Sequence, residues 1–316
     1  MPPVDWNRVR EDFPVLARTV HGKPLVYLDN GATMQVPRQV MQAMEEQYCC
    51  FQANIHRGIH YLSEQSTARV EQARRTVAEF IGAAETEEVI FTSGTTQSVN
   101  IAARSFSEAF LKPGDVVVST EMEHHSNLIP WQEACRRTGA VLEIVPLTET
   151  GELDLAEFRR LMERGPKLVA MTCVSNVLGT VNPVEELIPL AHAAGAAVLL
   201  DGAQAMRHRR IDVQKLDCEF LCFSGHKIMG PTGTGVLYGK RAWLEKMPPV
   251  LFGGGMVDEV QTKSATYGEL PFRFEAGTQN IVGIIGLGAA VDYMRKLGPE
   301  EMYRREQEVM RCAEQT

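Results

Sequence analysis

The chain has 316 residues and lacks the features that mark secreted, membrane and nucleic-acid-binding proteins. Its first residues contain no apolar core of a signal peptide. The longest apolar stretch, residues 281–291, is too short and too rich in glycine to span a bilayer. Basic residues are not in excess, because 40 Asp and Glu outnumber 32 Lys and Arg, whereas nucleic-acid binding needs a basic surface. These absences predict a cytoplasmic protein whose partners include neither a membrane nor a nucleic acid.

The cysteines show no pattern that is typical of disulfides or of a metal site. The seven cysteines are an odd number, which argues against a disulfide framework in a cytoplasmic chain. Cys218 and Cys222 fall in one strand-like run, and their spacing is not typical of a metal site. Cys173 and Cys222 stand in apolar runs, where free cysteine is usually a small buried residue. We therefore expect no bound metal, and the sequence shows no internal repeat or low-complexity linker.

Short apolar runs that are typical of strands alternate with helical stretches from about residue 24 to residue 283. The strand-like runs are 88–91, 116–119, 141–145, 168–172, 197–200, 219–223 and 235–238. Near-continuous apolar strands that alternate with helices indicate a mostly parallel sheet covered on both faces. Upstream, apolar residues recur at helical spacing, namely Trp6, Val9, Phe13 and Leu16. Residues 1–23 are therefore predicted to form an N-terminal helical arm.

Two side chains that follow apolar runs predict a site for pyridoxal 5'-phosphate (PLP). Asp201 ends the run 198–201, and Lys227 stands in Ser224-Gly-His-Lys after the run 220–223. Ligands collect at the carboxyl ends of strands in open α/β sheets, so both side chains are expected at one edge. PLP needs an amine for a Schiff base and an anion that keeps its ring nitrogen protonated. Taken alone, Asp201 has an alternative as a helix cap or turn residue and Lys227 as an exposed surface residue.

A third segment predicts a site for the phosphate of that cofactor. Thr92-Ser-Gly-Thr-Thr follows a strand-like run and precedes an apolar helical stretch. Small hydroxyl residues and a glycine at a helix N-terminus offer free N–H groups and the positive end of the helix dipole. We expect Thr95 and Thr96 to contact the phosphate, together with Ser224 and His226. Hydroxyl residues at such a position also commonly cap a helix and bind nothing.

The wider sequence resembles the class V aminotransferase-like branch of the PLP enzymes with the type I fold. Eight segments carry the resemblance, in this order: Tyr27-Leu-Asp-Asn-Gly-Ala-Thr, His56-Arg-Gly-Ile-His, Phe91-Thr-Ser-Gly-Thr-Thr, Glu121-Met-Glu-His-His-Ser-Asn, Val174-Ser-Asn-Val-Leu-Gly-Thr, Asp201-Gly-Ala-Gln, Ser224-Gly-His-Lys and Arg273-Phe-Glu-Ala-Gly-Thr-Gln-Asn. Within that branch the chain is most similar to SUF-type (group II) cysteine desulfurases, a group that includes selenocysteine lyases. The resemblance covers essentially all residues and implies an α/β fold with a mostly parallel central sheet flanked by helices.

The resemblance also implies roles for the residues around the cofactor. Lys227 is expected to hold PLP as a Schiff base and to shuttle protons. Asp201 is expected to pair with the ring nitrogen, since an opposite charge favours the protonated ring. His124 is expected to stack on the ring and to assist proton transfer, with a helix-capping or surface histidine as its alternative. Gln204 and Asn176 are expected near the ring oxygen, and either amide has loop stabilisation as its alternative.

Three further residues are assigned by the resemblance alone. Thr278 is expected to reach the phosphate of a second subunit, which predicts a homodimer. His56 and Arg57 belong to a segment expected near the substrate, where a cation suits the carboxylate of an amino acid. A basic turn in solvent is the alternative for these two residues. Asn176 is a further candidate for contact with the substrate.

The resemblance implies domain limits as well. The N-terminal arm, 1–23, is followed by a PLP-binding domain over residues 24–285, and residues 286–316 are expected to begin a small C-terminal domain. Members of the family carry the cysteine that attacks the substrate sulfur in that small domain, beyond where this sequence stops. None of the seven cysteines here matches it. We therefore expect a C-terminally truncated chain, either a fragment or a shortened gene product.

Three functions are open on this basis. The first is a cysteine desulfurase that converts L-cysteine to L-alanine and passes sulfur to an enzyme persulfide, and then to a sulfur-acceptor protein for iron–sulfur cluster assembly. The second is a selenocysteine lyase, which acts on L-selenocysteine, or another class V PLP lyase. The third is a PLP-binding dimer without turnover. We favour the first because it accounts for every motif and for the abrupt C-terminus.

Overall fold

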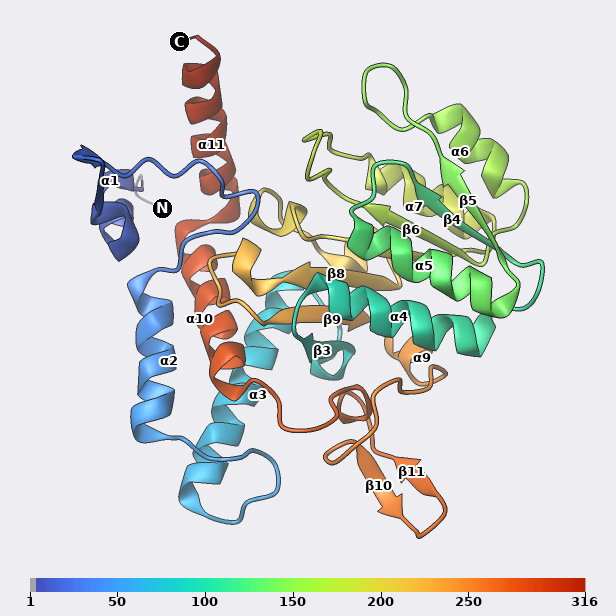
Figure 1. The fold of residues 1–316 in the computed structure, drawn as a ribbon, viewed down its shortest axis with the longest axis horizontal. Coiled ribbons are helices and arrows are strands. Elements are labelled where there is room, and N and C mark those ends of the chain that lie inside the picture. Colours follow the sequence, from blue (N-terminus) through green and yellow to red (C-terminus); the bar gives the residue numbers. More distant parts are fainter. Residues whose placement is uncertain (1–3, 316) are drawn as a thin grey trace.

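The computed structural model describes residues 4–315, and their main feature is a mostly parallel sheet (Figure 1). Among these residues the largest sheet has seven strands in the order β3-β9-β8-β7-β6-β4-β5. Their bounds are β3 Val89–Thr92, β4 Val116–Thr120, β5 Val141–Val145, β6 Leu168–Thr172, β7 Ala197–Asp201, β8 Phe220–Ser224 and β9 Gly235–Gly239. Neighbouring strands are parallel except at β9, which runs antiparallel to both β3 and β8. The predicted α/β fold is confirmed, and each strand lies within one or two residues of its expected range.

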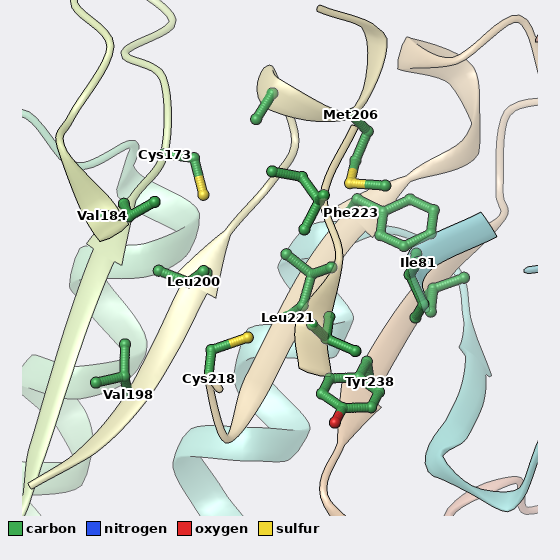
Figure 2. Close-up of a cluster of buried hydrophobic side chains, with 14 of the residues drawn as sticks. Ile81, Cys173, Val184, Val198, Leu200, Met206, Cys218, Leu221, Phe223 and Tyr238 are labelled. Carbon is green, nitrogen blue, oxygen red and sulfur yellow. The ribbon is translucent and has the colours of Figure 1, made fainter. Parts of the chain in front are cut away.

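Helices cover both faces of this sheet. The first face packs against α3 (Tyr61–Ile81), α6 (Leu155–Met162), α7 (Val184–Ala193), α8 (Val213–Leu216) and α10 (Ile281–Leu297), and the second against α4 (Thr95–Phe110), α5 (His125–Thr138) and α9 (Arg241–Leu244). Neighbours along a strand point to opposite faces, so Leu200 joins the first cluster and Leu199 the second. Figure 2 shows Leu200, Leu221, Phe223 and Tyr238 together in the first cluster. Burial on both faces explains why the strands read as continuous apolar runs.

The glycine-rich run near the C-terminus forms a buried helix. Helix α10 packs against α3 and against α2 (Arg38–Cys50), and most of its residues are buried. At Gly288 an added Cβ would lie 2.8 Å from the Cβ of Ala73, so only glycine allows α10 and α3 to approach this closely. The expected domain limit between residues 285 and 286 falls inside this continuous helix. No helix in the described range has both the length and the apolar character needed to cross a bilayer.

The segments at the two ends of the chain lie outside the sheet. Residues 1–3 of the expected N-terminal arm lie outside the described residues. From residue 4 on, the arm is helical only in α1 (Trp6–Glu11) and the 3-10 helix η1 (Pro14–Ala17), and continues as the hairpin β1 (Thr19–Val20) and β2 (Lys23–Pro24). Beyond α10, helix α11 (Pro299–Glu314) projects away from the sheet and buries none of its described residues (Figure 1). A second hairpin, β10 (Val257–Val260) and β11 (Ala265–Tyr267), projects from the opposite end.

Candidate active site

Most of the predicted cofactor residues line one cavity of about 500 Å³ at the carboxyl ends of β6, β7 and β8. Asp201 is the last residue of β7 and Ser224 the last of β8, and the 3-10 helix η4 (Gly225–Lys227) follows at once with Lys227. The predicted residues that line the cavity are Thr95, Thr96, His124, Asn176, Asp201, Gln204, Ser224, His226 and Lys227. The structure therefore brings together predicted residues as far apart in the sequence as Thr95 and Lys227.

Asp201 and Lys227 carry opposite charges in this cavity and leave most of their bonding capacity unused. Asp201 is buried, and among residues 4–315 its carboxylate accepts only from the backbone N–H of Ala203, which donates to Oδ1 over 2.8 Å. Burial raises the pKa of this carboxyl, against the opposing effects of the Ala203 amide and of the Lys227 and His124 charges. Burial likewise lowers the pKa of the Lys227 amine, and Asp201 opposes that shift. The Lys227 amine has no hydrogen bond or ion pair to any residue in 4–315, so it is free to react.

The N-terminus of α4 forms a second wall of the cavity. The backbone N–H of Thr95 donates to Ser224 Oγ over 2.8 Å, and the two hydroxyl groups are also 2.8 Å apart. Close packing of the backbone makes this contact possible, because a Cβ on Gly235 would lie 2.4 Å from the Cα of Gly94. No group in the described residues accepts from the backbone N–H of Thr96. An anion at this helix end would meet that N–H, the two hydroxyls and the helix dipole.

His124 holds two positions at once, as a cavity residue and as the N-cap of α5. Its Nδ1 accepts from the backbone N–H of Ser126 over 3.1 Å and lies 3.0 Å from Ser126 Oγ. Ser126 Oγ is in turn 2.6 Å from Thr96 Oγ1. His124 therefore caps α5, the role given above as its alternative. This bond fixes the imidazole beside the N-terminus of α4.

The remaining predicted residues close the cavity with help from the segment 29–34. Gln204 Nε2 donates to the carbonyl of Gly31 over 2.9 Å, and the carbonyl of His226 accepts from the backbone N–H of Met34 over 2.8 Å. Burial, together with the Lys227 charge, lowers the pKa of His226. Asn176 is exposed in the cavity mouth and has no hydrogen bond among residues 4–315.

Three predicted residues do not join this cavity. His56, Arg57 and Thr278 line a separate cavity of about 590 Å³, together with Phe272 and Glu275. The His56 ring packs edge-on against Phe272 with centroids 4.9 Å apart, and burial lowers the pKa of this histidine. Within one chain the structure therefore divides the predicted site residues into two groups.

Sequence reasoning overlooked Arg207, in the 3-10 helix η3 (Ala205–Arg207) that follows β7. Its Nη1 donates to the carbonyl of Asn30 over 2.5 Å, which holds the 29–34 segment at the cavity wall. Its charge also lowers the pKa of Lys227. Its position only three residues after Gln204 was a possible sign that Arg207 lies near the site. A single basic residue in a loop belongs to no helical or strand pattern, however, and so was not singled out.

Comparison with known proteins shows the family of this chain. Residues 26–316 match the family "Aminotransferase class-V". A cysteine desulfurase from Serratia proteamaculans (strain 568) is 50% identical over 308 residues, which are 97% of this chain and 76% of that protein. The chain belongs to the cysteine desulfurases of the class V aminotransferase family.

Solved structures of cysteine desulfurases and related proteins share this fold. The cysteine desulfurase from Thermococcus onnurineus NA1, solved without ligand, superposes with a TM-score of 0.92 at 41% identity, over 98% of this chain and 75% of that one. A more distant protein has glycine covalently linked to its PLP cofactor. It superposes with a TM-score of 0.79 at 23% identity, over 93% of this chain and 76% of that one. The class V family is PLP-dependent.

The cavity residues of this cysteine desulfurase fit PLP on three structural observations. The Lys227 amine has no protein partner, one carboxylate oxygen of buried Asp201 has none either, and the backbone N–H of Thr96 lacks an acceptor within residues 4–315. An aldehyde, a protonated ring nitrogen and a phosphate match these three groups in charge and in bonding capacity. The cavity residues are therefore complementary to the cofactor.

Proposed function

We propose that this chain catalyses the PLP-dependent transfer of sulfur from L-cysteine to a thiol, which yields L-alanine and a persulfide. In that reaction the carbon–sulfur bond of cysteine breaks, a sulfur–sulfur bond forms, and a proton replaces sulfur on carbon. The observation that carries the proposal is the meeting of an unpaired Lys227, an underbonded Asp201 and the open N-terminus of α4 in one cavity. The identity of the relatives as cysteine desulfurases supports the choice of substrate.

Bound PLP supplies an electron sink for the carbanion that forms on the amino acid. Residues that line the cavity would hold PLP at two ends. Asp201 would keep the ring nitrogen protonated, and Thr95, Thr96, Ser224 and His226, which line the same cavity, would hold the phosphate. Lys227, whose amine has a lowered pKa, would move a proton at the substrate α-carbon. Gln204 and Asn176 remain our candidates for the ring-oxygen edge.

We also propose that the enzyme works as a homodimer. Thr278, His56 and Arg57 lie in the second cavity, away from Lys227 in the same chain. A second copy that placed its second cavity against the first would bring Thr278 to the phosphate and Arg57 to the substrate carboxylate. The division of these residues between two cavities supports this arrangement, because a single chain leaves the predicted site incomplete.

We further propose that the sulfur-accepting thiol is not one of the seven cysteines described. None of them lines the cavity of Lys227. Burial raises the pKa of Cys135 to about 11 and of Cys218 to about 12, and it also raises the pKa of Cys173 and Cys222, so these thiols stay protonated and unreactive. The persulfide sulfur would then pass to an acceptor protein of iron–sulfur cluster assembly.

The first experiment compares the 1–316 protein with Lys227→Ala. The wild-type protein is expected to bind PLP with the visible absorbance of a lysine-linked cofactor, and borohydride is expected to fix the cofactor on Lys227. Lys227→Ala should lose this covalent attachment, while Lys263→Ala, which alters an exposed lysine of the β10–β11 hairpin, should retain it. A wild-type protein that fails to bind PLP would contradict the proposal.

Turnover is tested next with L-cysteine and L-selenocysteine, with dithiothreitol as an external thiol. Production of alanine and sulfide from cysteine, lost in Lys227→Ala, is the expected result. Turnover of selenocysteine alone would identify a selenocysteine lyase. Cofactor binding without turnover of either amino acid would identify the chain as a PLP-binding protein that needs further residues for catalysis.

A further inference from the structure

Glu123 is a buried carboxylic acid next to the candidate active site, and the mechanism above gives it no role. It lies between β4 and α5, directly before His124, and only 7% of its surface is exposed. Burial raises its pKa to about 8, although three hydrogen-bond donors oppose that shift. A carboxyl held in the interior at this cost needs a structural reason.

Its two oxygens collect donors from three elements of the fold. The hydroxyl of Thr120, at the end of β4, donates to Oε1 over 2.6 Å. The backbone N–H of Thr172, at the end of β6, donates to the same oxygen over 2.8 Å. The side-chain amide of Asn127, in the first turn of α5, donates to Oε2 over 2.6 Å. One side chain thus joins two strand ends to the start of a helix.

These three contacts lead directly to groups that line the cavity. Asn127 is fixed further by Trp131, whose indole N–H donates to its Oδ1 over 3.2 Å, and the backbone N–H of Asn127 donates to the carbonyl of His124 over 2.8 Å. Thr172 lines the cavity itself and pairs in register with Asp201 of β7. Glu123 therefore connects two parts of the candidate site. One is His124, which is expected on the face of the cofactor ring, and the other is β6, which lies beside Asp201, the residue expected at the ring nitrogen.

Only a carboxyl group satisfies all three donors. When Glu123 is ionised, both oxygens accept. When it is protonated, its proton can go to the Thr120 hydroxyl, which alone among the three partners can also accept, while the other two contacts persist. A glutamine has an NH₂ group that faces the N–H of Thr172 in one orientation and the NH₂ of Asn127 in the other. In either orientation two N–H groups would face each other in the protein interior without an acceptor between them.

We propose that Glu123 is a positioning residue for the reaction, which sets the His124 ring against the cofactor by joining the start of α5 to the ends of β4 and β6. This inference rests on the proposed function, because it needs PLP in the cavity. Glu123 touches neither substrate nor cofactor, since it does not line the cavity.

The test compares Glu123→Gln with Glu121→Gln. Glu121 is an exposed carboxylate two residues earlier that accepts from the backbone N–H of Leu147, a bond that a glutamine oxygen keeps. Each protein is freed of cofactor and titrated with PLP to obtain the Kd, and the visible circular dichroism of the bound cofactor is recorded. PLP itself is achiral, so this dichroism reports the side chains that surround its ring and not overall stability. Thermal unfolding without cofactor shows whether each variant is folded.

We expect Glu123→Gln to raise the Kd for PLP about tenfold and to halve the visible dichroism at least, with Glu121→Gln like wild type. A Glu123→Gln protein with wild-type Kd and dichroism overturns the inference. If that variant does not fold, Thr120→Val decides, because it removes one donor and leaves the carboxyl. A change in the same direction then supports the inference, and wild-type values overturn it. Wild-type protein that binds no PLP would instead contradict the proposed function itself.

Discussion

Two pairs of opposite charge in this molecule, one buried and one lining a cavity, are built in contrasting ways. Arg74 of α3 and Glu275 form a double hydrogen bond, with Nη1 to Oε1 at 2.7 Å and Nη2 to Oε2 at 2.9 Å. The backbone carbonyl of Val89 and the carboxylate of Glu71 also accept from Arg74, and the backbone N–H of Phe91 donates to Glu275. Asp201 and Lys227, by contrast, share a cavity without a hydrogen bond or ion pair between them. The saturated pair holds the structure together, and the unsaturated pair leaves its bonding capacity for a ligand.

The largest expected effect breaks the saturated pair. Glu275→Gln leaves the buried Arg74 charge with the partly exposed Glu71 as its remaining carboxylate partner, so the free energy of unfolding should fall by about 3–5 kcal/mol. Urea unfolding of the cofactor-free protein measures this loss. Glu71→Gln is the matched control, because Glu71 also contacts Arg74 but is partly exposed, and its loss should be much smaller. Equal losses in the two variants would show that buried Glu275 stabilises Arg74 no more than partly exposed Glu71 does.

A smaller effect concerns the pH dependence of stability. The pKa of Glu123 is raised to about 8 in the folded protein, so its contribution to stability is complete at acidic pH and is lost as the pH rises toward 8. The free energy of unfolding of wild type minus that of Glu123→Gln should therefore fall between pH 5 and pH 8 by roughly 3–4 kcal/mol. Unfolding curves of both proteins across that range measure it. A constant difference would show that Glu123 ionises at an ordinary pKa.

The smallest expected change in stability comes from the unsaturated pair. Asp201→Asn removes a buried charge that has one described hydrogen bond, and asparagine Oδ1 can still accept from Ala203. Without cofactor, the free energy of unfolding should change by less than about 1 kcal/mol, and in the stabilising direction. The affinity for PLP should nevertheless fall about a hundredfold, since the ring nitrogen loses its counter-ion. A large loss of stability would mean that Asp201 is a structural residue.

The sequence was informative where function depends on residues near strand ends. Asp201, Ser224 and Lys227 follow apolar runs directly, so the rule for parallel sheets was enough to place them together. Glu123 was not identifiable in the same way, because its partners Thr120, Asn127 and Thr172 belong to three elements, and their meeting depends on tertiary packing.

The C-terminal part shows a second limit of sequence reasoning. The family resemblance placed a domain limit at residue 285, and glycines in the run 281–291 are ordinarily unfavourable inside a helix. In the structure they allow α10 to pack closely on α3, as Gly288 does on Ala73. Packing between helices thus outweighed local propensity. The domain limit at residue 285 stays a prediction of the family resemblance.

The capping bond of His124 fixes which of its ring nitrogens carries hydrogen. Because Nδ1 accepts from the backbone N–H of Ser126, the neutral imidazole carries its hydrogen on Nε2. That tautomer presents a hydrogen-bond donor to any group that it meets through Nε2, while the other nitrogen is occupied where α5 begins. The boundary of a helix thus decides which edge of this histidine can donate a hydrogen bond to a ligand.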